Sequence, residues 1–245
     1  MAFSGHSHYP LTDDRSIWQG AFTSIGAASL RYAGMPHAEF QPEGFENSGA
    51  EGKGSAELNA AKLSPAPVDH SCRHGLLVSV YDDCIVYSRR DFCNDLPIGD
   101  DWVQPLPASE SQPFAFAAHA ARTIAPQFPK GAKLALSRVK AKTRKGEEKD
   151  AVEVSIPAAT KGGRVLYFDV VAGKKGGEKR RKRIFATGFA TSERSKQASE
   201  PTLCRFAVDE LPAPDASFAA VPVNCFGKRG RPLVAHQAQL NGKES

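Results

Sequence analysis

The chain of 245 residues lacks any apolar run that approaches the length of a membrane span, which takes about 20 consecutive apolar residues. No secretory signal is predicted at its start, because no basic segment precedes the first apolar residues. The net charge of +5 is mild, so charge alone does not indicate a nucleic-acid-binding protein. These features are those of an ordinary globular protein, and they leave its compartment unknown.

Cysteine is scarce, and its spacing is not that of a zinc site or a redox pair. The chain has five cysteines, an odd number, and no two of them are separated by only two residues. We therefore expect buried thiols rather than a disulfide framework. A Cys84–Cys93 or a Cys204–Cys225 bridge is the alternative if the protein is exported.

Long helices are not predicted in the second half of the chain, where short alternating segments predominate. The apolar residues Val152, Val154 and Ile156, for example, alternate with polar ones, which is the period of a half-buried strand. Such strands, separated by Gly, Pro and Lys turns, favour an antiparallel β-sandwich over residues 113–236, which we expect to fold without the rest. The predicted strands are 134–139, 151–156, 164–171, 184–190, 203–208 and 218–223.

The first half contains shorter β segments and one long irregular stretch. Residues 76–81 and 84–88 predict a hairpin with its turn at Asp82-Asp83. Residues 33–71 are dominated by Gly, Pro, Glu and Ala, so we expect an insertion that is mostly disordered. A proline-rich linker then separates the two halves. The fold class expected for the whole chain is mainly β (α+β).

The most informative feature near the start is the segment Gly5-His6-Ser7-His8. Residues 2–4 are expected to end a buried strand, and Gly5 then breaks it and lets backbone and ligand come close. His6 and His8 are two residues apart, so in an extended segment both imidazoles point to the same face. Neutral imidazole nitrogens suit divalent transition metals, which makes this pair a candidate metal site. The alternative is two surface histidines that bind nothing.

This segment resembles the Gly-His-x-His motif of calcineurin-like metallophosphoesterases. Later stretches that are similar to bacterial-type members of the family are 16–26, 77–83, Arg90-Asp-Phe92 and Asp101-Trp-Val103. The resemblance implies an α/β sandwich that ends near residue 108, in an enzyme that hydrolyses a phosphomonoester or a phosphodiester. It also implies a catalytic centre of two divalent metal ions (Mn, Fe or Zn), with His6 on one ion and His8 on the other.

The chain departs from the family pattern in the motifs that should precede Gly-His-x-His. These are Asp-x-His, Gly-Asp-x-x-Asp, Asn-His-Asp/Glu and a further His, and none of them is found upstream. We therefore expect residues 1–108 to be the C-terminal portion of a phosphoesterase domain, inactive without a missing N-terminal portion as its partner. The alternative is a non-catalytic binding or structural β-module in which the motif is a relic.

The second half carries a resemblance of its own and a basic run. Residues 163–171 resemble the central strand of a fibronectin type III-like or immunoglobulin-like module, which implies that fold for the sandwich. The basic run 174–183 is interpreted either as a polyanion-binding segment or as a solvated hairpin tip. The hairpin tip is favoured, because no aromatic residue is interleaved to stack on bases. A nucleic-acid partner is therefore not expected.

Two smaller groups of polar residues are further candidates. His70, Cys72 and His74 alternate on one face of an extended segment, but zinc would need a fourth ligand, so a plain strand entry is the other interpretation. Arg89-Arg90 would either contact phosphate or lie at an exposed strand end with Asp91 as a local partner.

Overall fold

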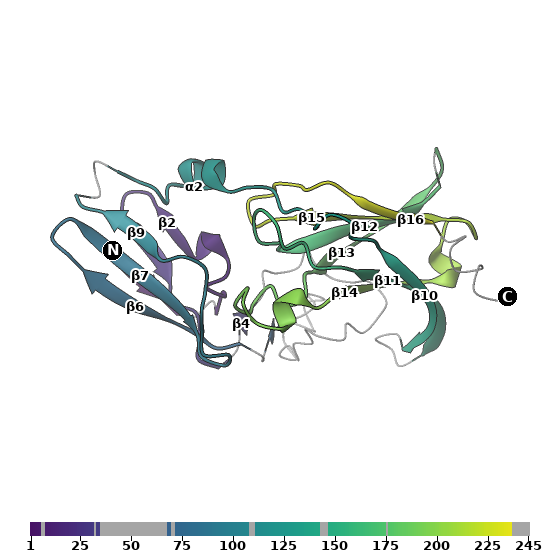
Figure 1. Cartoon of the computed structure of the whole chain (residues 1–245), viewed down its shortest axis with the longest axis horizontal. Helices are drawn as coiled ribbons and strands as arrows, with labels where there is room; N and C mark the ends of the chain where they lie inside the picture. Colours follow the sequence, from purple (N-terminus) through teal and green to yellow (C-terminus); the bar gives the residue numbers. More distant parts are fainter. Residues whose placement is uncertain are drawn as a thin grey trace, which may run out of the picture. The chain divides into compact units, whose positions relative to one another are not determined.

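The computed structural model describes most of the chain, and its contacts divide these residues into two compact units. The described residues are 1–5, 8–31, 33–34, 68–69, 72–107, 111–142, 147–174 and 176–236. Unit 1 contains the described residues up to Ile124 together with Gly188–Ser199, and unit 2 contains Ala125–Thr187 and the described residues from Glu200 onward. Strands dominate both units (Figure 1), which confirms the prediction of a mainly β fold.

The first sheet of unit 1 has three short strands in the order β1-β3-β2. β1 (Ala2–Ser4) runs parallel to β3 (Thr23–Gly26), and β2 (Ile17–Gln19) runs antiparallel to β3. The strand predicted at residues 2–4 is therefore present, but the prediction that it is buried is wrong. All three of its residues are exposed, because β1 lies at the edge of the sheet.

The second sheet of unit 1 is antiparallel, and it confirms the predicted hairpin. β6 (His74–Val80) pairs with β7 (Cys84–Asp91), and the N–H of Tyr81 donates to the carbonyl of Cys84 across the turn at 2.8 Å. β7 also pairs with β8 (Leu96–Pro97) and with β9 (Trp102–Pro105).

Short elements complete unit 1. β4 (Ala33–Gly34) pairs with β5 (Val68–Asp69), and the rest of the predicted 33–71 insertion between them lies outside the described residues. η1 (Asp14–Ser16) and η2 (Gln197–Ser199) are single 3-10 turns, and α2 (Phe116–Arg122) is a short α-helix. Within the described chain, no helix has the length and apolar character needed to cross a membrane.

One buried apolar cluster joins the two sheets of unit 1. Ile17 and Ile25 come from the first sheet, and Ile85, Tyr87 and Trp102 come from the second. Tyr87 is fully buried, and its hydroxyl lies 3.1 Å from Oε1 of Gln104, to which it donates. The apolar inner face of each sheet is thus covered by the other, as layered folds require.

Unit 2 consists of two antiparallel sheets that pack through a common core. The three-stranded sheet has the order β10-β11-β14, with β10 (Ala135–Lys142), β11 (Glu148–Ile156) and β14 (Thr202–Ala207). The four-stranded sheet has the order β13-β12-β15-β16, with β13 (Lys179–Phe185), β12 (Tyr167–Gly173), β15 (Ser217–Val223) and β16 (Leu233–His236). The two sheets form separate layers in Figure 1. η3 (Val208–Glu210) follows β14 as a 3-10 turn.

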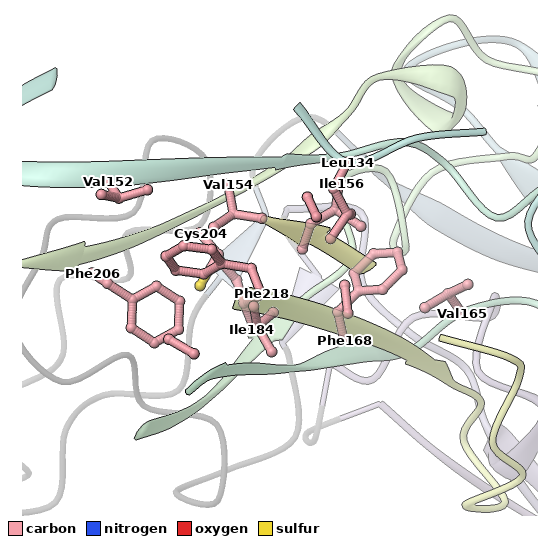
Figure 2. Close-up of a cluster of buried hydrophobic side chains, with 14 residues drawn as sticks. Leu134, Val152, Val154, Ile156, Val165, Phe168, Ile184, Cys204, Phe206 and Phe218 are labelled. Atoms are coloured by element: carbon pink, nitrogen blue, oxygen red, sulfur yellow. The ribbon is translucent and has the colours of Figure 1, made fainter. Parts of the chain in front are cut away.

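Apolar side chains from both sheets of unit 2 fill the space between them (Figure 2). Val154 from β11 and Phe206 from β14 belong to the same buried cluster as Phe168 from β12 and Phe218 from β15. The rings of Phe206 and Phe218, one from each sheet, lie 5.6 Å apart between centroids. Val154 is one of the alternating apolar positions that the sequence predicts, and aromatic contacts such as that of Phe206 with Phe218 stabilise the packing beyond the burial of area.

Two strands of unit 2 differ from the prediction. β13 spans Lys179–Phe185 rather than 184–190, so much of the basic run forms a strand and not a hairpin tip. Its pattern is hard to detect, because only Ile184 in this strand is both apolar and buried. β16 has no counterpart among the predicted strands, since four residues carry little alternation.

The division into units differs from the two continuous domains predicted as 1–108 and 113–236. α2 belongs to unit 1, and so does Gly188–Ser199, which lies between two strands of unit 2 in the sequence. The contacts of Ser192 give the physical reason. Its N–H donates to the buried carboxylate of Asp91 at 3.2 Å, and its hydroxyl donates to the carbonyl of Pro97 at 2.7 Å.

All five cysteines are free, and neither of the two alternative disulfides forms. Cys72 and Cys204 are buried, as expected, whereas Cys84 and Cys225 are half-buried and Cys93 is exposed. Burial raises the pKa of Cys204 to about 12, so its thiol stays protonated at neutral pH. Cys204 therefore reacts with thiol reagents only when the core of unit 2 opens.

We predict that Asp91→Asn lowers the stability of unit 1. The buried carboxylate accepts from the N–H of Cys93 at 3.1 Å, the side-chain amide of Asn94 at 2.7 Å and the N–H of Ser192 at 3.2 Å. An Asn amide would turn N–H groups toward some of these donors. The loss of a hydrogen bond at a buried site costs about 1–3 kcal/mol.

Tryptophan fluorescence during urea unfolding measures this effect, because Trp18 and Trp102, the chain's two tryptophans, both lie in unit 1. The midpoint should fall for Asp91→Asn and stay unchanged for Asp95→Asn. Asp95 undergoes the same chemical change, but its side chain is 86% exposed in a surface ion pair with Arg90. Equal shifts for the two variants would contradict the assigned role of Asp91.

Candidate functional site

The segment that carries the two candidate histidines follows β1. His6 lies outside the described residues, whereas His8 is described and its side chain is half-buried. The N–H of His8 donates to the carbonyl of Gly5 at 3.3 Å and closes a turn. The φ angle of His8 is 54°, in the left-handed region. Few residues other than glycine adopt this conformation, and such residues cluster at functional sites.

The strand before this turn is fixed to the chain that follows β3. The N–H of Ala27 donates to the carbonyl of Ser4 at 2.6 Å, directly after the parallel pairing of β1 with β3. A Cβ atom at Gly5 would lie 3.7 Å from the carbonyl oxygen of Ala28, which is an ordinary contact. Crowding by the described residues therefore does not require glycine at this position, contrary to the expectation of a close approach.

The loop after His8 is held by two buried side chains from the β6–β7 hairpin. The N–H of Leu11 donates to Nδ1 of His74 at 3.1 Å, and Nη1 of Arg89 donates to the carbonyl of Leu11 at 2.9 Å. The two backbone groups of Leu11 are thus bound by side chains 63 and 78 positions further along the chain. These contacts fix the loop against the hairpin.

The contact with Leu11 gives His74 a structural role. Its Nδ1 accepts a hydrogen bond, so the ring is the neutral tautomer with its proton on Nε2. The zinc interpretation of His70, Cys72 and His74 gains no support, because His70 lies outside the described residues and Nδ1 of His74 is already engaged. Of the three residues, His74 is the first residue of β6, as the strand-entry interpretation expects of it.

Arg89 and Arg90 have different surroundings, because successive residues of β7 point to opposite faces. Arg89 is buried, its Nη2 donates to the carbonyl of Asp100 at 2.5 Å, and its guanidinium lies 4.2 Å from the ring centre of Trp102. Arg90 is exposed and pairs with Asp95 at 2.6 Å. Neither arginine pairs with Asp91, the predicted partner, since that carboxylate binds Ser192 and the turn after β7.

A compact turn follows Leu11 and leads into β2. The buried carboxylate of Asp13 accepts from the N–H of Arg15 at 2.9 Å and from its guanidinium at 2.6 Å. The hydroxyl of Ser16 donates to the carbonyl of Pro10 at 3.0 Å. Asp13 thereby caps the 3-10 turn η1 and fixes the direction in which the chain leaves the candidate loop.

A second histidine with an unusual environment lies on α2. Burial lowers the pKa of His119, and the positive charges of Arg122 and Arg89 act in the same direction, against the carboxylates of Asp14 and Asp13. Its ring packs edge-on against Phe114, with 5.5 Å between ring centres. His119 is therefore held neutral in the folded protein.

The described residues do not assemble a metal centre around His8. Across the described ranges, no group of three or more His, Cys, Asp and Glu side chains is placed so that it could share a metal ion. A catalytic zinc ion typically takes three protein ligands, so the residues in view do not fit the two ions that the motif implies. The roles of His6 and His8 therefore stay predictions.

We predict that His74→Leu destabilises unit 1 more than His74→Asn. Leucine leaves the buried N–H of Leu11 without its acceptor, which costs about 1–3 kcal/mol. The Oδ1 atom of asparagine can take the place of Nδ1 and retain part of the bond. Fluorescence-detected urea unfolding gives the stabilities, and amide hydrogen exchange at Leu11 reports the bond itself. Unchanged protection at Leu11 in the leucine variant would rule out this account.

We also predict that unit 1 loses stability as the pH falls below about 6.5, the ordinary pKa of histidine. Because the pKa of His119 is lowered in the folded protein, the unfolded chain binds the proton first as the pH falls, so acid favours unfolding. His119→Gln should flatten the dependence of stability on pH between about pH 7.5 and 5.5. His236→Gln, at an exposed histidine of unit 2, should leave it unchanged. A slope that persists in His119→Gln would assign the effect elsewhere.

Comparison with protein-family models, curated proteins and solved structures gave no match to this chain. The site must therefore be interpreted from its own geometry, in which the left-handed His8 and its anchored loop are the most informative features.

Proposed function

We propose that the chain carries the histidine loop of a calcineurin-like metallophosphoesterase, in which His6 and His8 bind two divalent metal ions. The observation that carries the proposal is the left-handed backbone of His8 in the turn after β1. A side chain in such a conformation, in a loop anchored by buried Arg89 and His74, is positioned before any ligand binds. β1 also pairs parallel with β3, and α/β proteins bind ligands beyond the carboxyl ends of such strands.

The proposal assigns the remaining ligands to a missing N-terminal portion, because the described residues do not supply them. Two ions need about three protein ligands each, and the two histidines offer one for each ion. Bound Mn, Fe or Zn ions would supply an activated water for hydrolysis of a phosphomonoester or a phosphodiester. The chain alone is therefore expected to be inactive.

For unit 2 we propose a fibronectin type III-like or immunoglobulin-like module. Its support is the arrangement of seven strands in antiparallel sheets of three and four around one core. Such a module offers a second candidate function, a non-catalytic binding or structural role with Gly5–His8 as a relic. The cationic strand β13 at the edge of the larger sheet favours this second candidate.

A rate measurement with an aryl phosphate and added Mn²⁺ tests the first proposal. The chain alone should show no turnover, whereas a longer protein that includes the upstream coding sequence should be active. His8→Gly in the longer protein should lower the rate at least about tenfold, as losses around metal ligands do. Glycine retains access to the left-handed conformation and removes only the imidazole.

The controls separate ligand loss from general damage. His6→Ala should also abolish most of the rate, and His236→Ala, at an exposed histidine of β16, should leave it unchanged. Metal-dependent turnover by the chain alone would show that the centre lies elsewhere. A longer protein that tolerates both His6→Ala and His8→Gly would favour the non-catalytic function.

A further inference from the structure

Among the described strands, none pairs with one of the two edges of the cationic strand β13. It is the first strand in the order β13-β12-β15-β16, and β12 is its one partner among the described strands. Its sequence is Lys-Arg-Arg-Lys-Arg-Ile-Phe, and the first three side chains are exposed. The unpaired N–H and C=O groups of an edge strand can pair with a strand from another chain.

One of its cations is bound within unit 2. Lys182 lies opposite Val170, on the face of the sheet that is turned toward the core. Its ammonium group binds the carboxylate of Glu210 at 3.1 Å and the carbonyl of Arg205 at 3.0 Å, and it lies 5.0 Å from the ring centre of Phe206. Lys182 therefore covers the side of the sandwich and takes no part in an external contact.

The cations at alternate positions point to the outer face. They are Lys179, Arg181 and Arg183, and neither Lys179 nor Arg181 forms an ion pair with a described residue. Arg183 binds Asp169 at 2.7 Å, and Arg229 binds the same carboxylate at 2.6 Å. Two guanidinium groups thus share one negative charge, and the outer face along β13 keeps an excess of positive charge.

The carboxylate of Asp169 is ionised at neutral pH. Burial alone would raise its pKa, but hydrogen bonds from Arg183 and Arg229 and their positive charges hold the pKa below its ordinary value. This carboxylate therefore stays occupied by its two arginines. An incoming acidic group would find Lys179 and Arg181 as the available cations.

We propose that the open edge of β13 binds an extended acidic peptide segment of a partner protein by β-strand addition. Alternate residues of a strand are about 6.6–6.8 Å apart, so the outer cations match carboxylates at alternate positions of an added strand. Side chains directly opposite in such a pair lie about 5 Å apart, within reach of ion pairs. Backbone hydrogen bonds supply the affinity, and the charges select the partner.

The same charges disfavour other occupants of this edge. A second copy of the chain would place cations opposite cations, which destabilises edge-to-edge pairing. Single-stranded nucleic acid is usually bound through aromatic rings on which bases stack, and none is interleaved between Lys179 and Arg183. An acidic strand would supply backbone partners along this edge and carboxylates for Lys179 and Arg181.

The test uses the full chain and a fluorescently labelled peptide, Ser-Glu-Val-Glu-Val-Glu-Ser, followed by fluorescence anisotropy at low salt. A second peptide replaces both valines by proline, which keeps the charge and removes two N–H donors. We expect saturable binding of the first peptide and roughly tenfold weaker binding of the second, since proline cannot pair along the edge. Equal binding of both peptides would overturn strand addition.

Two variants locate the binding site. Arg181→Glu should weaken binding of the valine peptide roughly five- to tenfold, because one attraction becomes a repulsion. Lys130→Glu, the same charge reversal at an exposed residue of unit 2 outside β13, should leave binding unchanged, and both variants should retain protection of Cys204 from thiol reagents. Absence of binding, or tighter Arg181-dependent binding of a thymidine heptamer or of anionic vesicles, would overturn the proposal. None of these outcomes depends on the proposed metal-binding role of His6 and His8.

Discussion

The buried hydrogen bonds to Leu11 are the constraint on which the candidate site depends. A backbone N–H and a backbone C=O in a dry environment must find partners, and here His74 and Arg89 provide them. Both partners come from the β6–β7 hairpin, whose own position is fixed by the apolar cluster around Tyr87. The loop that follows His8 is thereby held against the hairpin.

Arg89 makes this arrangement costly to alter. Its guanidinium binds two backbone carbonyls, those of Leu11 and Asp100, and it lies over the ring of Trp102. An arginine is suited to this position because its planar group presents several donors while its face packs on an aromatic ring. Lysine would keep the charge but could not make all of these contacts at once.

In unit 2, the edge strand β13 carries charged side chains on both of its faces. Lys182 points inward at the edge and is bound by Glu210 and a backbone carbonyl, so the side of the sandwich is polar but satisfied. An inward-pointing charge at an edge discourages pairing with further apolar strands. Lys179 and Arg181, on the outer face of β13, would then favour acidic peptide segments over other segments that pair with this edge.

The sequence predicts those strands whose apolar pattern is local, and it does not predict features that depend on a contact with a distant segment. The hairpin of β6 and β7 and the strand β11 show alternation that residues a few positions apart reveal. The exposure of β1 depends on its place at the edge of its sheet, and β13 is a strand because β12 pairs with it. Neither the exposure of β1 nor the strand conformation of β13 can be predicted from the residues of that segment alone.

The candidate site shows the same limit. The spacing of His6 and His8 suggests a metal site, but the left-handed backbone of His8 depends on the turn that closes onto Gly5. The role of His74 is set by Leu11, 63 positions away, and a side chain to backbone bond of that kind leaves no periodic signal. In the sequence alone, His74 is either a zinc ligand or part of a strand entry, and neither interpretation includes a bond to Leu11.

Because Gly188–Ser199 belongs to unit 1, unit 2 is not one continuous segment of the chain. A fragment of residues 113–236 would contain all strands of the sandwich and its core, yet it would lack Asp91 and Pro97, the partners of Ser192. That this fragment folds alone therefore stays a prediction, and it would have to fold without these two partners of Ser192. Because Gly188–Ser199 joins β13 to β14, the connection between the two sheets of unit 2 passes through unit 1.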